Sequence, residues 1–170
     1  MTRTWIRRAA AAGAMAIGLC ARGEGNQLVL EGSTTVGPIA KAFAEYTMGL
    51  HRDLNITVSE SGSGNGAKSL VNGTCDIATL SRAMKDAEFA AAAQKGIQPV
   101  PHVIAYDGIA VVTHPSNPVK ALSLEQVRGI YTGRIANWKD VGAADQPIVA
   151  VTRDTNSGTY ECFESLVMNK

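Results

Sequence analysis

The amino-acid sequence predicts an α/β fold with a largely parallel sheet. Three times along the N-terminal part of the chain, a short strand-like segment is followed by a turn of small residues and then by a helical segment. This alternation is typical of parallel sheets, because successive parallel strands need a crossover between them. The length of 170 residues suits one such domain, or one domain and part of another.

The first strand is predicted at residues 27–30, and the turn at 32–37 leads into a helix whose first turn tolerates Pro38. Apolar residues then recur at helical spacing: Ile39, Ala40, Phe43, Ala44 and Tyr46. Residues 54–59 alternate apolar and polar side chains, which is typical of a strand. The other elements predicted in this part are a glycine-rich turn at 61–66, a helix at 67–71, a strand at 76–80 and a helix at 86–95.

The second part of the chain predicts the beginning of another lobe. Ser123 and Gln126 have the spacing of a capping box at a helix start. We expect a near-complete first lobe at 21–115 and an incomplete second lobe at 116–170. The elements predicted here are a β-rich run at 98–113, a turn at 114–118 suited to a crossover between lobes, a helix at 123–131, a strand at 147–152 and a helix at 157–168.

Residues 1–20 have the pattern of an export signal. Basic residues precede an apolar run at 9–19, which is too short for a membrane-spanning helix of about 20 residues. Two interpretations of the end of this signal peptide stay open. Residues 17–20 resemble a lipoprotein signal that would lipidate Cys20, whereas residues 14–16 offer an ordinary small-x-small cleavage site.

Composition and charge exclude several classes of protein. Sixteen Lys and Arg stand against fifteen Asp and Glu; without the three arginines of the leader, thirteen basic residues face fifteen acidic ones, a formal charge of −2. Such a chain lacks both the basic field of a nucleic-acid-binding protein and the composition of a disordered one. Cys75 and Cys162 are too far apart for a metal or redox motif, and the histidines are isolated. We expect no metal, no cofactor and no catalytic residue.

Three turns share a design that suits an oxyanion. Residues 32–35, 62–66 and 156–159 each place small hydroxyl residues and at least one glycine between a predicted strand and a predicted helix. The first N–H groups of a helix lack partners within it, and the helix dipole favours negative charge there. Arg153 precedes the third turn, and its guanidinium suits a phosphate-like group. One such turn alone is more often an ordinary helix cap, so the interpretation rests on all three.

Several motifs then occur in a fixed order along the chain. They are Gly32-Ser33-Thr34-Thr35-Val36, Ser61-Gly62-Ser63-Gly64, Gly73 with Asp76-Ile77-Ala78 and Ser81-Arg82, Asp107-Gly108-Ile109-Ala110-Val111-Val112, Ile130-Tyr131-Thr132-Gly133 with Asn137-Trp138, and Arg153 with Ser157-Gly158-Thr159. From about residue 28 to its end the sequence thereby resembles the phosphate-binding component of bacterial phosphate ABC importers. The resemblance implies a two-lobed periplasmic-binding-protein fold of type II, with the anion held between the lobes.

The resemblance also implies the ligands of the anion. Thr34 would donate its hydroxyl and Thr35 its backbone N–H, while Ser63 would donate a hydroxyl from the second turn. Arg153 would supply the charge-assisted pair. The full set of predicted phosphate-binding residues is Thr34, Thr35, Ser63, Ser81, Arg153, Ser157, Gly158 and Thr159.

Two features depart from the family pattern. Members carry a carboxylate where Ser81 stands, and it accepts a hydrogen bond from protonated phosphate, which disfavours sulfate. Glu60, Asp107 and Asp154 are alternative acceptors, but each also suits a turn or a cap. Family members continue well past residue 170, so we expect a C-terminally truncated second lobe.

The leading hypothesis is an extracytoplasmic solute-binding protein that captures inorganic phosphate and delivers it to an ABC transporter permease. We expect a monomer whose only attachment to the membrane would be a lipid on Cys20, in case the lipoprotein interpretation of residues 17–20 holds. Three alternatives stay open: a binder of sulfate or molybdate, a phosphohydrolase with Ser63 or Thr34 as nucleophile, and an inactive fragment.

Overall fold

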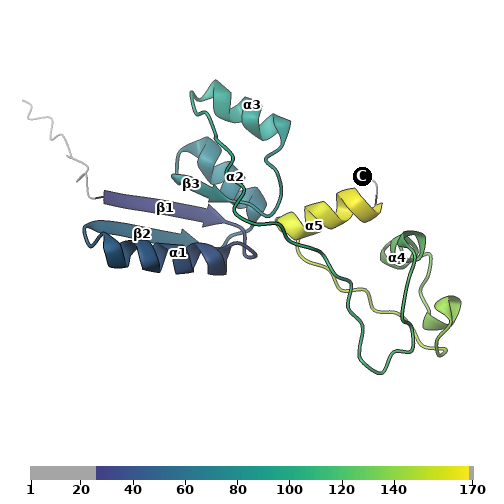
Figure 1. The fold of residues 1–170 in the computed structure, drawn as a ribbon. Coiled ribbons are helices and arrows are strands. Elements are labelled where there is room, and N and C mark those ends of the chain that lie inside the picture. The colour runs from purple at the N-terminus through teal and green to yellow at the C-terminus, as the bar shows by residue number, and fades with distance from the viewer. Residues whose placement is uncertain (1–25, 169–170) are drawn as a thin grey trace, which may run out of the picture.

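The computed structural model describes residues 26–168, which form two parts joined by extended segments (Figure 1). The expected signal peptide at 1–20, with the candidate lipidation site Cys20, lies outside the described residues. The first part, called here the sheet lobe, spans residues 26–97. The second, called the distal part, spans residues 110–151 and lies beyond the final helix (Figure 1).

The sheet lobe contains a three-stranded parallel sheet. Its strands are β1 (Asn26–Gly32), β2 (Leu54–Ser59) and β3 (Ile77–Thr79), in the order β2-β1-β3. Apolar and polar side chains alternate along β2, where the apolar ones are half-buried. The predicted parallel α/β architecture is therefore confirmed. β2 has its predicted bounds, and the bounds of β1 and β3 differ from prediction by one or two residues.

Helices cover both faces of this sheet. The helix α1 (Gly37–Leu50) packs against β2, whereas α2 (Ser63–Asn72) packs against β1 and β3. The helix α3 (Asp86–Gln94) lies outside α2 (Figure 1). Crossovers between parallel strands are right-handed. The chain moves from β1 to β2 in one direction across the sheet and from β2 to β3 in the other, so α1 and α2 lie on opposite faces. The loops that follow the three strands open at one edge of the sheet, which is where α/β proteins place their ligands.

The core of the sheet lobe is built from small side chains. Ala40 and Ala44 of α1 are buried, whereas Phe43 of the same helix is 60% exposed and Tyr46 is 70% exposed. The periodicity that predicted α1 is confirmed, but the face that contacts the sheet is the alanine face. Small residues spaced four apart on a helix let its backbone approach the strands closely, and the large apolar side chains then remain outside.

The helix α2 begins earlier than predicted. Residues 61–66 were expected to form a turn and 67–71 a helix, but the helix already starts at Ser63. Gly62 adopts a φ of 97° as its N-cap, and its N–H donates to the carbonyl of Gly32 at 2.7 Å. Gly66 lies against the end of β1. The glycines therefore do not break this helix; they let its first turn approach the strand.

Replacing Gly66 by alanine should destabilise the fold. A Cβ at this position would lie 2.6 Å from the carbonyl oxygen of Glu31 and 2.7 Å from the Cα of Gly32, both main-chain atoms that cannot rotate away. We expect the free energy of unfolding to fall by about 1–3 kcal/mol or more, as in overpacked cores. Thermal unfolding followed by circular dichroism measures the change. Gly49→Ala is the control, because a Cβ there meets nothing within 4 Å and a helical alanine should raise stability slightly.

The distal part contains α4 (Leu124–Tyr131) and the 3₁₀ helix η1 (Trp138–Val141). The predicted capping box is confirmed: Ser123 Oγ accepts from the N–H of Gln126 at 3.2 Å, and the amide oxygen of Gln126 accepts from the N–H of Ser123 at 2.8 Å. The chain then returns to the sheet lobe through α5 (Gly158–Phe163), which continues as the π-helix η2 (Glu164–Met168).

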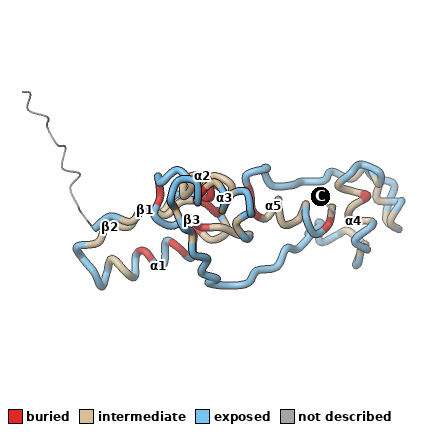
Figure 2. The backbone as a smooth tube through the Cα atoms, turned by 90° about the horizontal axis from the view of Figure 1, so that it is seen from above, coloured by how far each residue is buried: buried red, intermediate tan, exposed pale blue. Residues whose placement is uncertain are grey.

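Two predicted strands are wrong. Residues 98–113 and 147–152 run extended between the two parts, but within the described chain only an isolated bridge, between Asn137 and Pro147, involves either of them. Both segments are exposed (Figure 2). Extended segments become strands only when they pair, and these two have no partner strand among residues 26–168.

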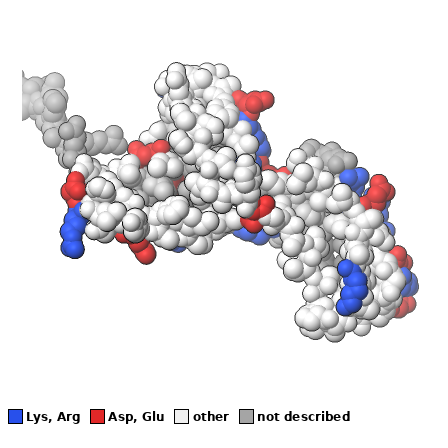
Figure 3. Space-filling view, in the orientation of Figure 1, with Lys and Arg blue, Asp and Glu red and all other residues white. Residues whose placement is uncertain are grey.

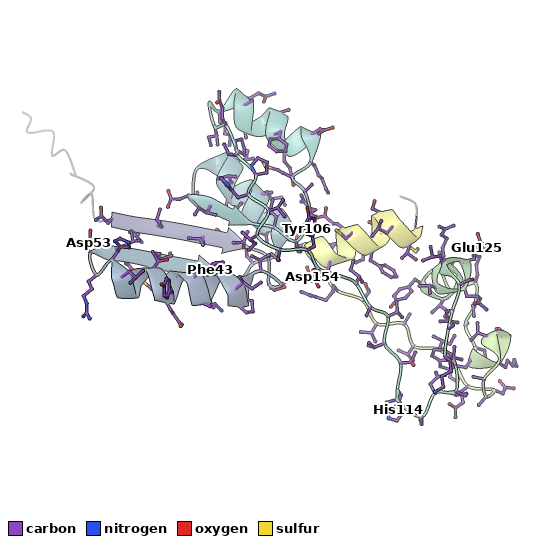
Figure 4. All side chains as sticks on the ribbon, in the orientation of Figure 1. Phe43, Asp53, Tyr106, His114, Glu125 and Asp154 are labelled. Atoms are coloured by element: carbon purple, nitrogen blue, oxygen red, sulfur yellow. The ribbon has the colours of Figure 1, made fainter. Side chains whose placement is uncertain are left out.

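The predicted crossover turn at 114–118 lies elsewhere than expected. His114 lies at the far tip of the distal part, whereas Tyr106 and Asp154 mark the places where the two segments pass between the parts (Figure 4). A cavity of about 800 Å³ lies between these segments, α4 and η1. In the stretch from residue 26 to residue 168, no helix is long and apolar enough to cross a membrane.

Candidate oxyanion site

The loop after β1 is held by a buried serine that sequence reasoning did not single out. Ser33 is 2% exposed, and its hydroxyl oxygen accepts from the N–H of Thr35 at 3.1 Å and from the N–H of Val36 at 3.2 Å. Its own N–H donates to the carbonyl of Thr79 in β3 at 2.7 Å. The N–H of Thr35, which the resemblance assigns to the anion, thus bonds Ser33 here. Ser33 belongs to the Gly-Ser-Thr-Thr motif, and its short hydroxyl next to a helix start was the available signal.

The second and third strand loops meet at a pair of serines. Ser63 begins α2 and is fully buried, and its hydroxyl lies 3.1 Å from that of Ser81. The N–H of Ser81 also donates to Ser63 Oγ at 3.1 Å. Two hydroxyls predicted as phosphate ligands, from residues 18 positions apart, are therefore adjacent in space.

The start of α5 closes over this serine pair. Ser157 is the N-cap of α5, and its hydroxyl oxygen accepts from the N–H of Tyr160 at 3.4 Å. Gly158 follows, and a Cβ on it would lie 2.4 Å from both Ser63 Oγ and Ser81 Oγ. Only a residue without a side chain brings the first turn of α5 this close to both hydroxyls.

Two further contacts join the same segment to the loop after β1. A guanidinium nitrogen of Arg153 donates to Thr34 Oγ1 at 2.7 Å, and the hydroxyls of Thr35 and Thr159 lie 3.4 Å apart. Arg153 and Thr34 are exposed, whereas Ser157 and Gly158 are buried. The structure thus brings the predicted residues into contact in three groups near the loops that follow the strands. These groups are Thr34 with Arg153, Thr35 with Thr159, and Ser63 and Ser81 with Gly158, which Ser157 precedes.

A cluster of four charged side chains lies beside the serine pair and was not predicted. Arg82 directly follows Ser81, and its guanidinium makes two hydrogen bonds to the carboxylate of Glu88 in α3, at 2.8 and 2.9 Å. Its Nε forms an ion pair with Glu161 in α5 at 2.8 Å, and Lys85 Nζ lies 2.6 Å from the same carboxylate oxygen. The hydrogen bonds to Glu88 raise the pKa of Arg82, with burial opposing them.

The stability of the protein should fall when Glu88 becomes protonated. Burial raises the pKa of this carboxyl, but the hydrogen bonds from Arg82 and from the N–H of Lys85, with the two positive charges, outweigh it and hold the pKa below 4.5. A carboxyl with a lowered pKa in the folded state adds stability above its ordinary pKa, and that stability is lost as the pH falls through the folded value. Urea unfolding between neutral pH and acid should show this loss. Glu88→Gln should flatten the dependence; an unchanged slope would contradict it.

The three candidate acceptors for a protonated anion have other partners. Glu60 forms an ion pair with Lys41 at 2.9 Å, while Asp107 and Asp154 accept N–H groups of their own turns, at 2.7 and 2.9 Å. The residues that converge here therefore offer hydroxyls, backbone N–H groups and one guanidinium. Among residues 26–168, no group of three or more His, Cys, Asp or Glu could hold a metal ion.

The arrangement suits a small dehydrated anion, because neutral donors from several loops and one positive side chain meet at a helix start. On the face shown in Figure 3, acidic and basic side chains are scattered and neither sign gathers in a broad patch. An anion would thus be held by these local donors and not by a long-range field. The fold is that of a two-part protein of the α/β class, with these donors gathered where its strand loops open.

Comparison with known proteins agrees with this class. Residues 20–170 match the PBP superfamily domain, and the chain belongs to that superfamily. It is 37% identical over 147 residues to Protein SphX of Synechococcus elongatus and 36% identical over 143 residues to the phosphate-binding protein PstS of Staphylococcus epidermidis, covering 82% of this chain in each case. The chain spans 43% and 44% of the length of these two relatives.

Solved structures give the same result. A phosphate ABC transporter substrate-binding protein from Clostridium perfringens, solved with bound phosphate, superposes with a TM-score of 0.74 at 43% identity and covers 84% of this chain and 56% of that one. An ABC-type phosphate transport receptor from Vibrio cholerae has a TM-score of 0.68 at 39% identity, covering 83% and 55%. The periplasmic-binding-protein-like fold implied by the resemblance is confirmed.

Proposed function

We propose that this protein captures inorganic phosphate at the site formed by the strand loops of the sheet lobe and the start of α5. The observation that carries the proposal is the contact of Gly158 with Ser63 and Ser81, because it brings hydroxyl and N–H donors from both sides of the site together. Arg153 supplies the positive charge. The phosphate-binding protein PstS and the phosphate-bound Clostridium perfringens protein, both similar to this chain, favour phosphate among tetrahedral anions.

The site supports binding without turnover. The hydroxyl of Ser63 is bonded to Ser81 and not to a histidine or a carboxylate that would remove its proton, whereas a nucleophilic serine needs such a base. We propose that the protein is not an enzyme. It delivers phosphate to the membrane subunits of an ABC transporter from an extracytoplasmic position, as a monomer, with a lipid on Cys20 as its only attachment to the membrane.

Isothermal titration of the purified protein with phosphate tests the proposal. We expect saturable heat with one site for phosphate, and competition experiments with sulfate and molybdate rank the three anions. A folded sample that gives no heat with phosphate would contradict the proposed function. Steady release of product from a chromogenic phosphate ester would contradict the absence of turnover.

A further inference from the structure

The charged cluster beside the site connects elements that lie far apart in the sequence. The side chain of Arg82 is only 7% exposed, and its contacts divide between two helices. The two terminal nitrogens bond Glu88 in α3, whereas Nε faces Glu161 in α5. The guanidinium therefore joins the sheet lobe to the helix that carries Ser157, Gly158 and Thr159.

The geometry of the cluster requires an arginine. A guanidinium presents donors in a fixed planar fork, so one edge can bond one carboxylate while Nε serves another; an ammonium is a single point charge. Lys85 also approaches Glu161, but its side chain is 58% exposed and is well screened by water. Arg82 Nε and Glu161 Oε2 are both buried, and neither has a hydrogen-bond partner among the described residues. Their 2.8 Å contact is therefore an ion pair and not an aligned hydrogen bond, and burial leaves its attraction less screened. Arg82 is the main link between the two helices.

Both halves of the oxyanion site are attached to this link. On one side, Arg82 follows Ser81 in the chain, so fixing the guanidinium fixes the adjacent serine. On the other side, the N–H of Glu161 donates to the carbonyl of Ser157 at 3.1 Å, within the first turn of α5. Holding the Glu161 carboxylate thus holds Gly158 over the serine pair. Among residues 26–168, Arg82 makes no hydrogen bond to the hydroxyls themselves, so it would act through other residues.

We propose that Arg82, through its ion pair with Glu161, is a positioning residue that sets the affinity of the oxyanion site. Without the pair, the start of α5 is free to move away from the sheet lobe. The donors of the sheet lobe and those of α5 can then no longer all lie within hydrogen-bonding distance of the same anion. Phosphate would then dissociate faster, while its association with either half would change little. The inference rests on the proposed function and adds to it a residue outside the predicted ligand set.

The test uses Arg82→Gln, Glu161→Gln and the double variant. Phosphate affinity and dissociation rate are measured well below the unfolding midpoint of each variant, and the midpoints are measured without phosphate. We expect each single change to weaken affinity by about tenfold or more, mainly through faster dissociation. The double variant should be no weaker than the weaker single variant, because both changes remove the same contact. Asp145→Asn, which removes an ion pair with Lys139 in the distal part, is the control and should bind normally.

The results distinguish a failure of the proposed function from a failure of the inference about Arg82. If the unchanged protein binds no phosphate, the proposed function is wrong and the inference falls with it. If it binds phosphate and both single variants keep its affinity while their midpoints fall, Arg82 is merely structural and only the inference is overturned. Losses that add in the double variant overturn it as well. Should Arg82→Gln fail to fold, Glu161→Gln alone decides, since it leaves the bonds between Arg82 and Glu88 in place.

Discussion

Replacing Gly158 by alanine is expected to remove most of the phosphate affinity of the protein. The added methyl would lie 2.4 Å from two hydroxyl oxygens and 3.0 Å from Ser63 Cβ. The hydroxyls of Ser63 and Ser81 can rotate, but rotation breaks their mutual hydrogen bond and turns them away from the site. The alternative is a shift of α5 away from the sheet lobe. Either response costs about 1–3 kcal/mol, which corresponds to roughly a 5- to 150-fold loss of affinity.

Titration of the Gly158→Ala variant with phosphate measures this loss. Gly108→Ala is the matched control, because the same methyl at that exposed position meets nothing within 4 Å. The control should bind phosphate as the unchanged protein does. Full affinity in Gly158→Ala would mean that α5 and the serine pair do not form the binding site.

Replacing Arg153 by alanine should weaken phosphate binding even more while leaving folding nearly unchanged. The guanidinium is exposed, and its hydrogen bond to Thr34 is a surface contact that adds little stability. A bound phosphate dianion, however, would lose its only neighbouring positive charge among the predicted ligands. Truncating one member of a buried, hydrogen-bonded charge pair costs about 2–5 kcal/mol of binding free energy. The loss reaches this range when the bound anion buries the guanidinium, which is exposed in this structure.

Two companion variants sharpen this test. Arg134→Ala removes another exposed arginine that donates to a threonine hydroxyl, at 3.3 Å, but lies in the distal part; it should bind phosphate normally. Arg153→Lys keeps the charge but cannot make two parallel hydrogen bonds, so its affinity should lie between those of the alanine variant and the unchanged protein. Equal affinities for Arg153→Ala and Arg134→Ala would show that Arg153 does not contact the anion.

Local patterns in the sequence predicted the sheet lobe well. Alternation along β2, the capping box at Ser123 and the proline in the first turn of α1 each depend on neighbours in the chain, and each is confirmed. Local patterns gave wrong predictions where the structure of a segment depends on pairing with another strand. The segments at 98–113 and 147–152 have β-forming residues, but a strand exists only with a second strand beside it.

The site likewise combines local features that the sequence predicts with long-range contacts that it does not. Hydroxyl-rich turns at helix starts identified its residues, because capping and anion binding need the same small donors. The contact of Gly158 with Ser63 and Ser81, and the ion pair between Arg82 and Glu161, join distant parts of the chain. No local spacing encodes such contacts. The motif Ser81-Arg82 carried the family resemblance, yet nothing in it indicated which carboxylates the arginine would meet.

Anomalous diffraction from crystals grown with arsenate, a tetrahedral analogue of phosphate, tests the central claim most directly. We expect one strong arsenic peak at a position that puts the arsenate oxygens within hydrogen-bonding distance of Ser63, Gly158 and Arg153. A peak found only elsewhere on the protein, with these three residues unoccupied by arsenate, would contradict it.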